Sequence, residues 1–136
     1  MSQELYLVDT SALVRYFRGQ VTEHWNDLIG AGRVGLCEPV RIEYLRSAGR
    51  QEDFHEADHF LTEMFPYHLV PDSLWSECAQ LQMDLANLSW HEGASMVDLV
   101  VAVTARHHGL TLLHLDRDFE VIAKLTGQPT KRIDAR

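Results

Sequence analysis

The sequence predicts an α/β fold, a three-layer α/β/α sandwich built on a central parallel sheet of about four to five strands. Short apolar runs alternate along the chain with longer segments in which apolar residues recur every three or four positions. This alternation is typical of parallel sheets, whose strands are joined by right-handed helical crossovers. We expect a single domain over residues 1–136, because no linker or repeat divides the chain and its length suffices for one hydrophobic core.

The expected strands are short and apolar, and turn-forming or polar residues bound them. In chain order they cover residues 4–9, 33–37, 67–70 and 110–115, with an edge strand over 131–133. The first ends at a carboxylate, Asp9, and a second carboxylate, Asp116, directly follows the fourth. Polar residues are therefore expected at the carboxyl ends of these strands.

Apolar spacing between the strands predicts seven helices. They cover residues 12–18, 21–31, 39–45, 51–65, 73–88, 95–108 and 119–125. Start signals come from Thr10 or Ser11 before the first helix, and from Pro39, Asp72 and Ser95 at later ones. Glycine or proline stops many of the helices, at Gly19, Gly30, Pro66, Gly109 and Gly127.

Composition indicates an ordinary soluble globular protein, with 46% hydrophobic and 24% charged residues. Cys37 and Cys78 lie far apart in apolar surroundings and are expected to be free core thiols. The three tryptophans are expected in core or dimer contacts rather than in base stacking: Trp25, Trp75 and Trp90. The sequence has neither a signal-peptide pattern nor the ~18 consecutive apolar residues of a membrane span, so we expect a cytoplasmic protein that makes no membrane insertion.

Four carboxylates are expected to meet at one edge of the sheet. Asp9 and Asp116 follow strands, and Glu43 and Asp98 fall in the first turns of helices that start from the same edge. Ligands of such sheets bind beyond the carboxyl ends of the strands. Asp98 would also be the third residue of a helix capped by Ser95, so a purely structural role as a helix cap is an alternative for that residue.

Four neighbouring carboxylates predict a divalent cation site. Two carboxylates about 5 Å apart repel each other by roughly 3 kcal/mol at an effective dielectric constant near 20, so four require a cation to stay ionised. Oxygen ligands favour Mg²⁺ or Mn²⁺, and such a site suits phosphodiester hydrolysis by a metal-activated water. Ser11 could hold a metal-bound water or a phosphate oxygen, and Asp118 is either a further acid of the site or the cap of the last helix.

The formal net charge of −8 argues at first against a nucleic-acid partner. The distribution of charge changes that argument, because setting aside the five acids of the predicted site leaves −3. Ten of the twelve basic residues are arginines, and several flank those acids: Arg15, Arg18, Arg41, Arg46 and Arg117. An acidic site surrounded by arginines is compatible with a nuclease.

Four segments resemble the PIN domain, and in particular the VapC toxins of bacterial VapBC toxin-antitoxin pairs. They are VDTSAL at 8–13, EYL at 43–45, DLVVA at 98–102 and LDRDFE at 115–120, in the order and spacing of that family. The resemblance implies the PIN fold and a Mg²⁺- or Mn²⁺-dependent endoribonuclease that acts as a toxin. Its catalytic metal ligands would correspond to Asp9, Glu43, Asp98 and Asp116, with Asp118 as an auxiliary acid and Ser11 as a supporting hydroxyl.

The resemblance also implies RNA as the substrate, an antitoxin protein that blocks the acidic pocket, and a homodimer. Two positions depart from the family pattern. His114 stands where many members carry Thr, which is expected to affect a second metal site or substrate contacts. Glu38 stands where a hydroxyl often caps the helix of Glu43, which concerns the start of that helix rather than the chemistry.

Three other interpretations compete with a nuclease. A non-catalytic PIN-fold interaction module could bind a partner protein through its acidic pocket, but degenerate sites usually lose acids and this sequence keeps all four. A phosphorylated receiver domain needs a lysine on a late strand, whereas Lys124 and Lys131 both follow the last acid of the set. His55 and His59 match the H-E-x-x-H pattern of zinc proteases, but no third ligand follows them at the required spacing.

Overall fold

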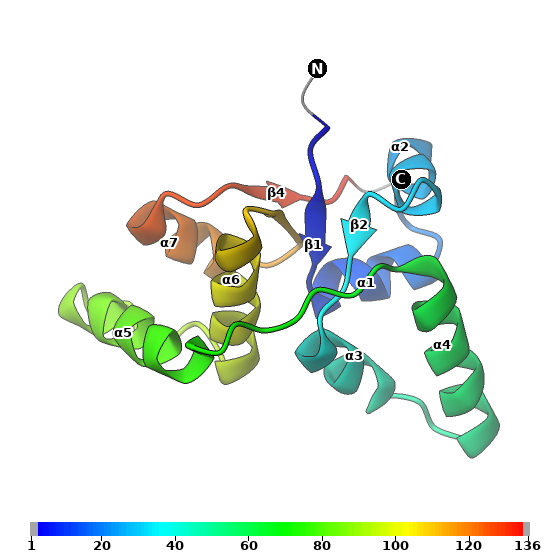
Figure 1. The fold of residues 1–136 in the computed structure, drawn as a ribbon, viewed down its shortest axis with the longest axis horizontal. Coiled ribbons are helices and arrows are strands. Elements are labelled where there is room, and N and C mark those ends of the chain that lie inside the picture. The colour runs from blue at the N-terminus through cyan, green and yellow to red at the C-terminus, as the bar shows by residue number, and fades with distance from the viewer. Residues whose placement is uncertain (1–2, 135–136) are drawn as a thin grey trace.

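Four parallel strands form the central sheet in the structure, a computed structural model that describes residues 3–134. The strands are β1 (Tyr6–Val8), β2 (Val34–Gly35), β3 (Thr111–His114) and β4 (Thr130–Arg132). They lie in the order β2-β1-β3-β4, with β1 near the middle of the molecule (Figure 1). Because β1 and β3 are parallel neighbours, the loops that follow them lie side by side at the carboxyl edge of the sheet.

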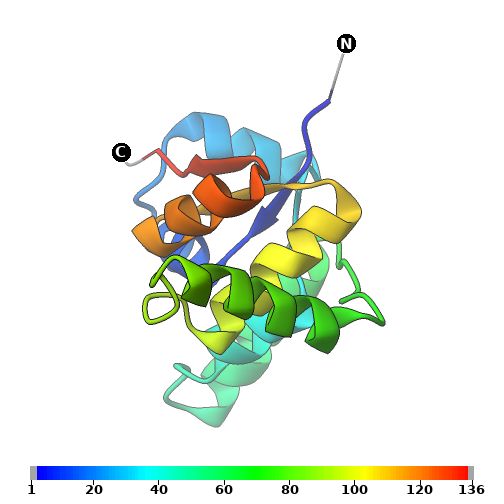
Figure 2. The same ribbon diagram turned by 90° about the vertical axis from the view of Figure 1, so that its left-hand side faces the viewer.

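Seven helices connect these strands within the described residues. They are α1 (Thr10–Phe17), α2 (Glu23–Gly30), α3 (Glu38–Leu45), α4 (Gln51–Met64), α5 (Leu74–Asn87), α6 (Met96–His108) and α7 (Arg117–Thr126). In Figure 2, α5 and α6 lie in front of β1 and α2 lies behind it, so helices cover both faces of the sheet. The predicted α/β architecture is confirmed, with four strands. In this part of the chain no helix combines the length and the hydropathy needed to cross a membrane.

The middle of the sheet is buried on both faces, which requires apolar side chains at successive positions rather than at alternating ones. Every residue of β1 and of β3 is buried. Helix α6 adds seven consecutive buried residues at 99–105. Trp25 of α2 is fully buried and contacts the ring of Tyr6 edge-on, as expected for a core tryptophan. Cys37 and Cys78 are buried free thiols, also as expected.

The strand expected over residues 67–70 is wrong in extent. A single parallel bridge forms there, between Leu36 and Tyr67. Pro66 and Pro71 flank the segment, and proline cannot donate a hydrogen bond to a neighbouring strand. Leu69 is 80% exposed, so the segment also lacks the burial that stabilises an edge strand.

Acids, rather than hydroxyls, cap two of the helices at the carboxyl edge. The side chain of Asp9 accepts a hydrogen bond from the first turn of α1, so the expected cap by Thr10 or Ser11 is wrong. Helix α7 is capped by Asp116, which accepts from the backbone N–H of Asp118, so Asp118 is not the cap of that helix. A carboxylate is favoured here because it also faces the positive end of the helix dipole.

Two other helix starts differ from the expectation. Helix α5 begins after Ser73, so Asp72 lies one residue before the cap position. Helix α3 begins after Cys37, whose side chain makes no capping hydrogen bond. Glu38 is therefore the first residue of α3 and does not replace a hydroxyl cap.

Candidate metal centre

A cleft of about 660 Å³ opens at the carboxyl edge of the sheet. All six residues predicted to form a site line it: Asp9, Ser11, Glu43, Asp98, Asp116 and Asp118. Arg15 and Arg18 of α1 line the same cleft and bring positive charge close to the acids. The order of the strands explains this convergence, because the carboxyl ends of β1 and β3 are adjacent.

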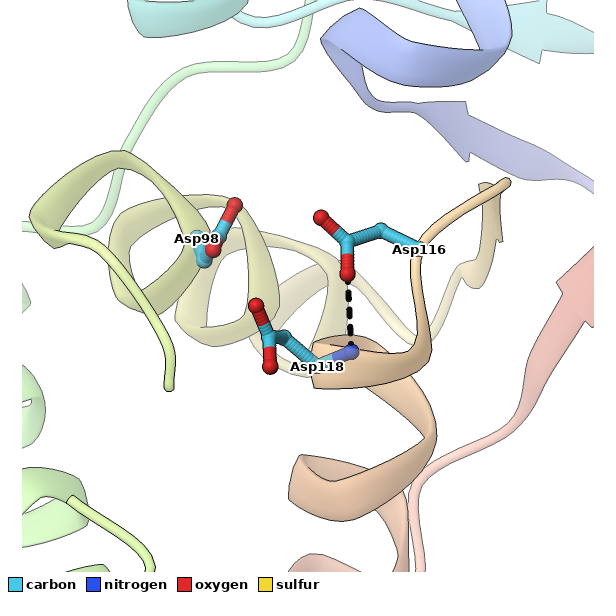
Figure 3. Close-up of side chains that lie close together, drawn as sticks. All are labelled: Asp98, Asp116 and Asp118. Atoms are coloured by element: carbon cyan, nitrogen blue, oxygen red, sulfur yellow. Dashed lines mark hydrogen bonds between the residues drawn. The ribbon is translucent and has the colours of Figure 1, made fainter. Parts of the chain in front are cut away.

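Three of the acids form a tight cluster. Oxygen atoms of Asp98, Asp116 and Asp118 all lie within 4.8 Å of one another. Figure 3 shows these side chains converging from the start of α6 and the start of α7. Residues 3–134 contain no second group of three or more metal-ligating side chains at such distances. His55 and His59 are exposed on α4, so the zinc-protease pattern forms no metal site in this part of the chain.

Burial and mutual repulsion disfavour the ionised form of these acids. Burial raises the pKa of Asp98, and the charges of Asp116 and Asp118 raise it further, against hydrogen bonds from the N-cap residue that lower it. Burial also raises the pKa of Asp118, with a further contribution from Asp116. A divalent cation among the three carboxylates would reverse these effects. Because the donors are all carboxylate oxygens, the set fits a cation such as Mg²⁺ or Mn²⁺.

Asp98 is at once a helix cap and a member of the cluster. The Oγ atom of Ser95 accepts a hydrogen bond from the backbone N–H of Asp98 at 3.1 Å, and Oδ2 of Asp98 accepts from the N–H of Ser95 at 3.0 Å. This reciprocal capping box locks the side chain at the start of α6. The structural role and the proposed metal role are thus compatible, because the cap orients the carboxylate toward the cleft.

Asp9 is the most deeply buried acid of the cleft, with 5% of its surface exposed. Its Oδ1 accepts from the N–H of Ala12 at 3.0 Å, and the hydroxyl of Ser11 donates to its carboxylate at 2.7 Å. Burial raises the pKa of Asp9 to about 6 despite these hydrogen bonds. The Oγ atom of Ser11 also accepts from the backbone N–H of Leu115 at 3.0 Å. Ser11 therefore ties the loop after β1 to the loop after β3.

Glu43 reaches the cleft from the last turn of α3 and is half-buried. The expected position in the first turns is wrong, because α3 begins at Glu38 and has only eight residues. Neither Glu43 nor Asp9 belongs to the tight cluster, although both line the cleft with it. From the sequence, Asp118 is expected to be only an auxiliary acid, whereas Asp9 and Glu43 are expected to be metal ligands. The structure places Asp118 in direct proximity to Asp98 and Asp116. The cleft thus holds a cluster of three acids with two further acids beside it.

His114 does not line the cleft and is fully buried. Its Nδ1 accepts a hydrogen bond from the backbone N–H of Asp116 at 3.1 Å, so the ring is neutral with its proton on Nε2. Burial lowers the pKa of His114, which also favours the neutral ring. His114 thus orients the turn that carries Asp116, and its effect on a second metal site or on substrate contacts stays a prediction. A threonine hydroxyl can accept from the same kind of N–H, two residues later.

Gly93 is a residue that sequence reasoning missed. A Cβ atom at this position would lie 2.7 Å from Oδ1 of Asp118, closer than real Cβ atoms approach other atoms. Gly93 also lines the cleft. No local pattern in the sequence connects the two residues, because the loop before α6 meets the start of α7 only in the folded chain.

Comparisons with known proteins show the family to which the chain belongs. The family model of the PIN domain matches residues 6–125. Ribonuclease VapC2 of Mycobacterium tuberculosis is 37% identical over 140 aligned positions, which cover 100% of this chain and 97% of that protein. Ribonuclease VapC21 of the same species is 31% identical over 130 positions, which cover 96% and 94% of the two chains.

Solved structures share the fold at lower identity. A DNA-bound VapBC complex from Salmonella typhimurium superposes with a TM-score of 0.76 at 14% identity, covering 96% of this chain and 98% of the other. VapBC-5 from Mycobacterium tuberculosis gives a TM-score of 0.65 at 24% identity, covering 97% and 99%. The match to the family model, the two relatives and the shared fold together show that this chain belongs to the PIN domain family, among proteins similar to the VapC ribonucleases.

Proposed function

We propose that this protein is a metal-dependent endoribonuclease and the toxin of a type II toxin-antitoxin system. The observation that carries the proposal is the cluster of Asp98, Asp116 and Asp118, with Asp9 and Glu43 in the same cleft. The relatives named ribonucleases, which match this chain over nearly its full length, support RNA as the substrate. The whole chain is proposed to act as one domain in the cytoplasm.

Four acids are proposed to hold the cation, namely Asp9, Glu43, Asp98 and Asp116, with Asp118 as an auxiliary acid. When bound, Mg²⁺ or Mn²⁺ supplies a lowered pKa for a coordinated water and charge compensation for the phosphate oxygens. The chain itself positions these acids through the capping box at the start of α6 and through the contacts of Ser11. Arg15 and Arg18 are proposed to bind phosphate groups of the RNA along the side of the cleft.

The partners are proposed from the similar structures. Those structures are VapBC complexes, which supports a cognate antitoxin as a partner of this chain. An antitoxin that covers the acidic cleft would block access of RNA to the acids. We also propose a homodimer, which sedimentation of the purified chain would test.

The direct test is cleavage of a labelled RNA pool by the purified chain. We expect cleavage with Mg²⁺ or Mn²⁺. We expect EDTA to abolish it and an excess of either ion to restore it. Cleavage that persists in EDTA, after removal of the metal has been verified, would contradict metal dependence. A chain that cleaves no RNA with either ion, yet binds its antitoxin through the cleft, would instead be a non-catalytic interaction module.

Gly93→Ala is expected to weaken Mn²⁺ binding by about 10-fold, because the added methyl group displaces the carboxylate of Asp118. Calorimetric titration with Mn²⁺ measures the change. Gly49→Ala is the matched control, since nothing lies within 4 Å of a Cβ atom at that loop position. In an Asp118→Ala background the obstructing oxygen is gone, so Gly93→Ala should have no further effect. An equal loss in both backgrounds would show that Gly93 does not act through Asp118.

A further inference from the structure

A second cavity, of about 330 Å³, adjoins the acidic cleft. The two share Gly93 and Asp118, so one wall of the second cavity belongs to the cluster of acids. Its interior is apolar, with Leu85 of α5 and Ile122 of α7 both buried. A cavity next to the proposed reaction centre can hold the part of a substrate that neighbours the reacting group.

The indole of Trp90 lines this cavity and is 41% exposed, which is inconsistent with a core position. Its backbone is held by a turn at the end of α5, in which the N–H of Trp90 donates to the carbonyl of Leu85 at 2.8 Å. Ser89, immediately before it, has a φ of 59° and is the one non-glycine residue with positive φ among residues 3–134. Residues with a Cβ atom seldom adopt this conformation, and such outliers concentrate at functional sites. The turn thus keeps an aromatic ring at the surface beside the acids.

Two cations complete the lining, Arg117 and Lys124. Both are exposed on α7, seven residues apart, which places them on one side of the helix two turns apart. Neither takes part in a salt bridge in the described part of the chain. Arg15 and Arg18 line the acidic cleft on α1. Positive side chains from two helices therefore flank the acids, as a polyanion crossing the cleft would require.

We propose that this cavity is a subsite for one unpaired nucleobase of the RNA, next to the phosphate that is cleaved. The proposal rests on the ribonuclease function proposed above. The cavity volume is at the low end of ligand pockets, which span ~300–1,000 Å³, and is of a size for a single base. Unpaired bases of RNA stack on aromatic rings, while their phosphates pair with Arg and Lys. Trp90 stacks on the base, and Arg117 and Lys124 contact the adjoining phosphates.

The charges favour RNA over a segment of protein as the occupant. An apolar side chain of a partner would fill the interior equally well, but it gives no reason for two cations without salt bridges around a ring beside the acids. A single strand of RNA accounts for the apolar interior, the aromatic ring and the cations, because each nucleotide combines a flat base with a phosphate. The enzyme should therefore select unpaired or looped RNA at this position.

The test compares steady-state cleavage of a labelled single-stranded RNA by the wild type and by Trp90→Ala, Trp90→Phe and Lys124→Ala, with Mn²⁺ present. Loss of stacking is expected to raise KM by about 5- to 100-fold in Trp90→Ala with little change in kcat. Trp90→Phe should restore most of the loss, because a smaller ring still stacks. His91→Ala, in the same exposed loop, and Lys131→Ala, on β4, are the matched controls and should behave as the wild type.

Direct binding separates failure of the subsite from failure of the proposed function. Fluorescence anisotropy of the same labelled RNA gives Kd for each variant whether or not cleavage occurs. A Kd and a KM unchanged in Trp90→Ala would overturn the subsite, even if the wild type cleaves RNA. So would a loss confined to antitoxin binding, which would assign the cavity to the partner protein. Equal thermal unfolding midpoints for the variants and the wild type exclude misfolding as the cause of any loss.

Discussion

Replacement of Asp98 by Asn is expected to lower RNA cleavage by at least about 100-fold while the fold stays intact. The amide oxygen of Asn can still accept from the N–H of Ser95, so the capping box at the start of α6 persists. The negative charge that the cluster needs to hold a cation is lost. Since burial and the neighbouring acids raise the pKa of Asp98, removal of its charge should also raise the unfolding midpoint of the metal-free protein.

The matched control for this variant is Asp53→Asn. Asp53 occupies the same third position of α4, is exposed, and lies outside the acidic cleft. Thermal unfolding with and without Mn²⁺ adds a readout that does not depend on the RNA. A ligand at 100 times its Kd stabilises a protein by about 2.7 kcal/mol, so the wild type should gain stability and Asp98→Asn should gain much less. Full cleavage activity in Asp98→Asn would rule out its assignment as a metal ligand.

Metal-free protein is expected to lose stability as the pH rises from about 4 to above 6, because of Asp9. Burial raises the pKa of Asp9 to about 6 from an ordinary value of 3.8, so the folded state holds the proton more tightly than the unfolded state. The stabilisation is present below the unfolded pKa and is lost as the pH passes the folded pKa. The free energy of unfolding is expected to fall by about 3 kcal/mol across this pH range. Urea unfolding in EDTA across this range measures the loss.

Asp9→Asn isolates this contribution, because other groups titrate in the same range. The amide of the variant retains an acceptor for the N–H of Ala12 but does not titrate in this pH range. Its free energy of unfolding should exceed that of the wild type at pH 7 and should approach it at pH 4. Curves for the two proteins that run parallel across the whole range would show that Asp9 titrates with an ordinary pKa.

The fold was predictable because its signals are local. Apolar runs mark β1 and β3, and apolar residues at helical spacing mark α5 and α6. The strand expected at 67–70 failed because apolar composition alone does not show whether a segment is covered, and Leu69 is exposed. The predicted cap of the first helix also failed, since Asp9 and the two hydroxyls that follow it are equally plausible caps until the chain is folded, whereas the predicted cap by Ser95 is confirmed.

The sequence by itself determined that Asp9 and Asp116 follow parallel strands and that Asp98 stands at the start of a helix, whereas Glu43 lies in the last turn of α3. That placement follows from chain order and from the handedness of crossovers, and it was enough to bring Asp9, Glu43, Asp98 and Asp116 to one cleft. The residue types at these four positions are read directly from the sequence.

Only the tertiary structure decided the distances within the cleft and the roles of the residues around it. It placed Asp118 in the tight cluster, Gly93 in contact with Asp118, and the side chain of His114 in the core. It also left Trp90 exposed at the mouth of a second cavity, which excludes the core position that was one of the two alternatives for this residue. The physical reason is that these contacts join segments far apart in the chain, so they depend on how helices pack rather than on any local pattern.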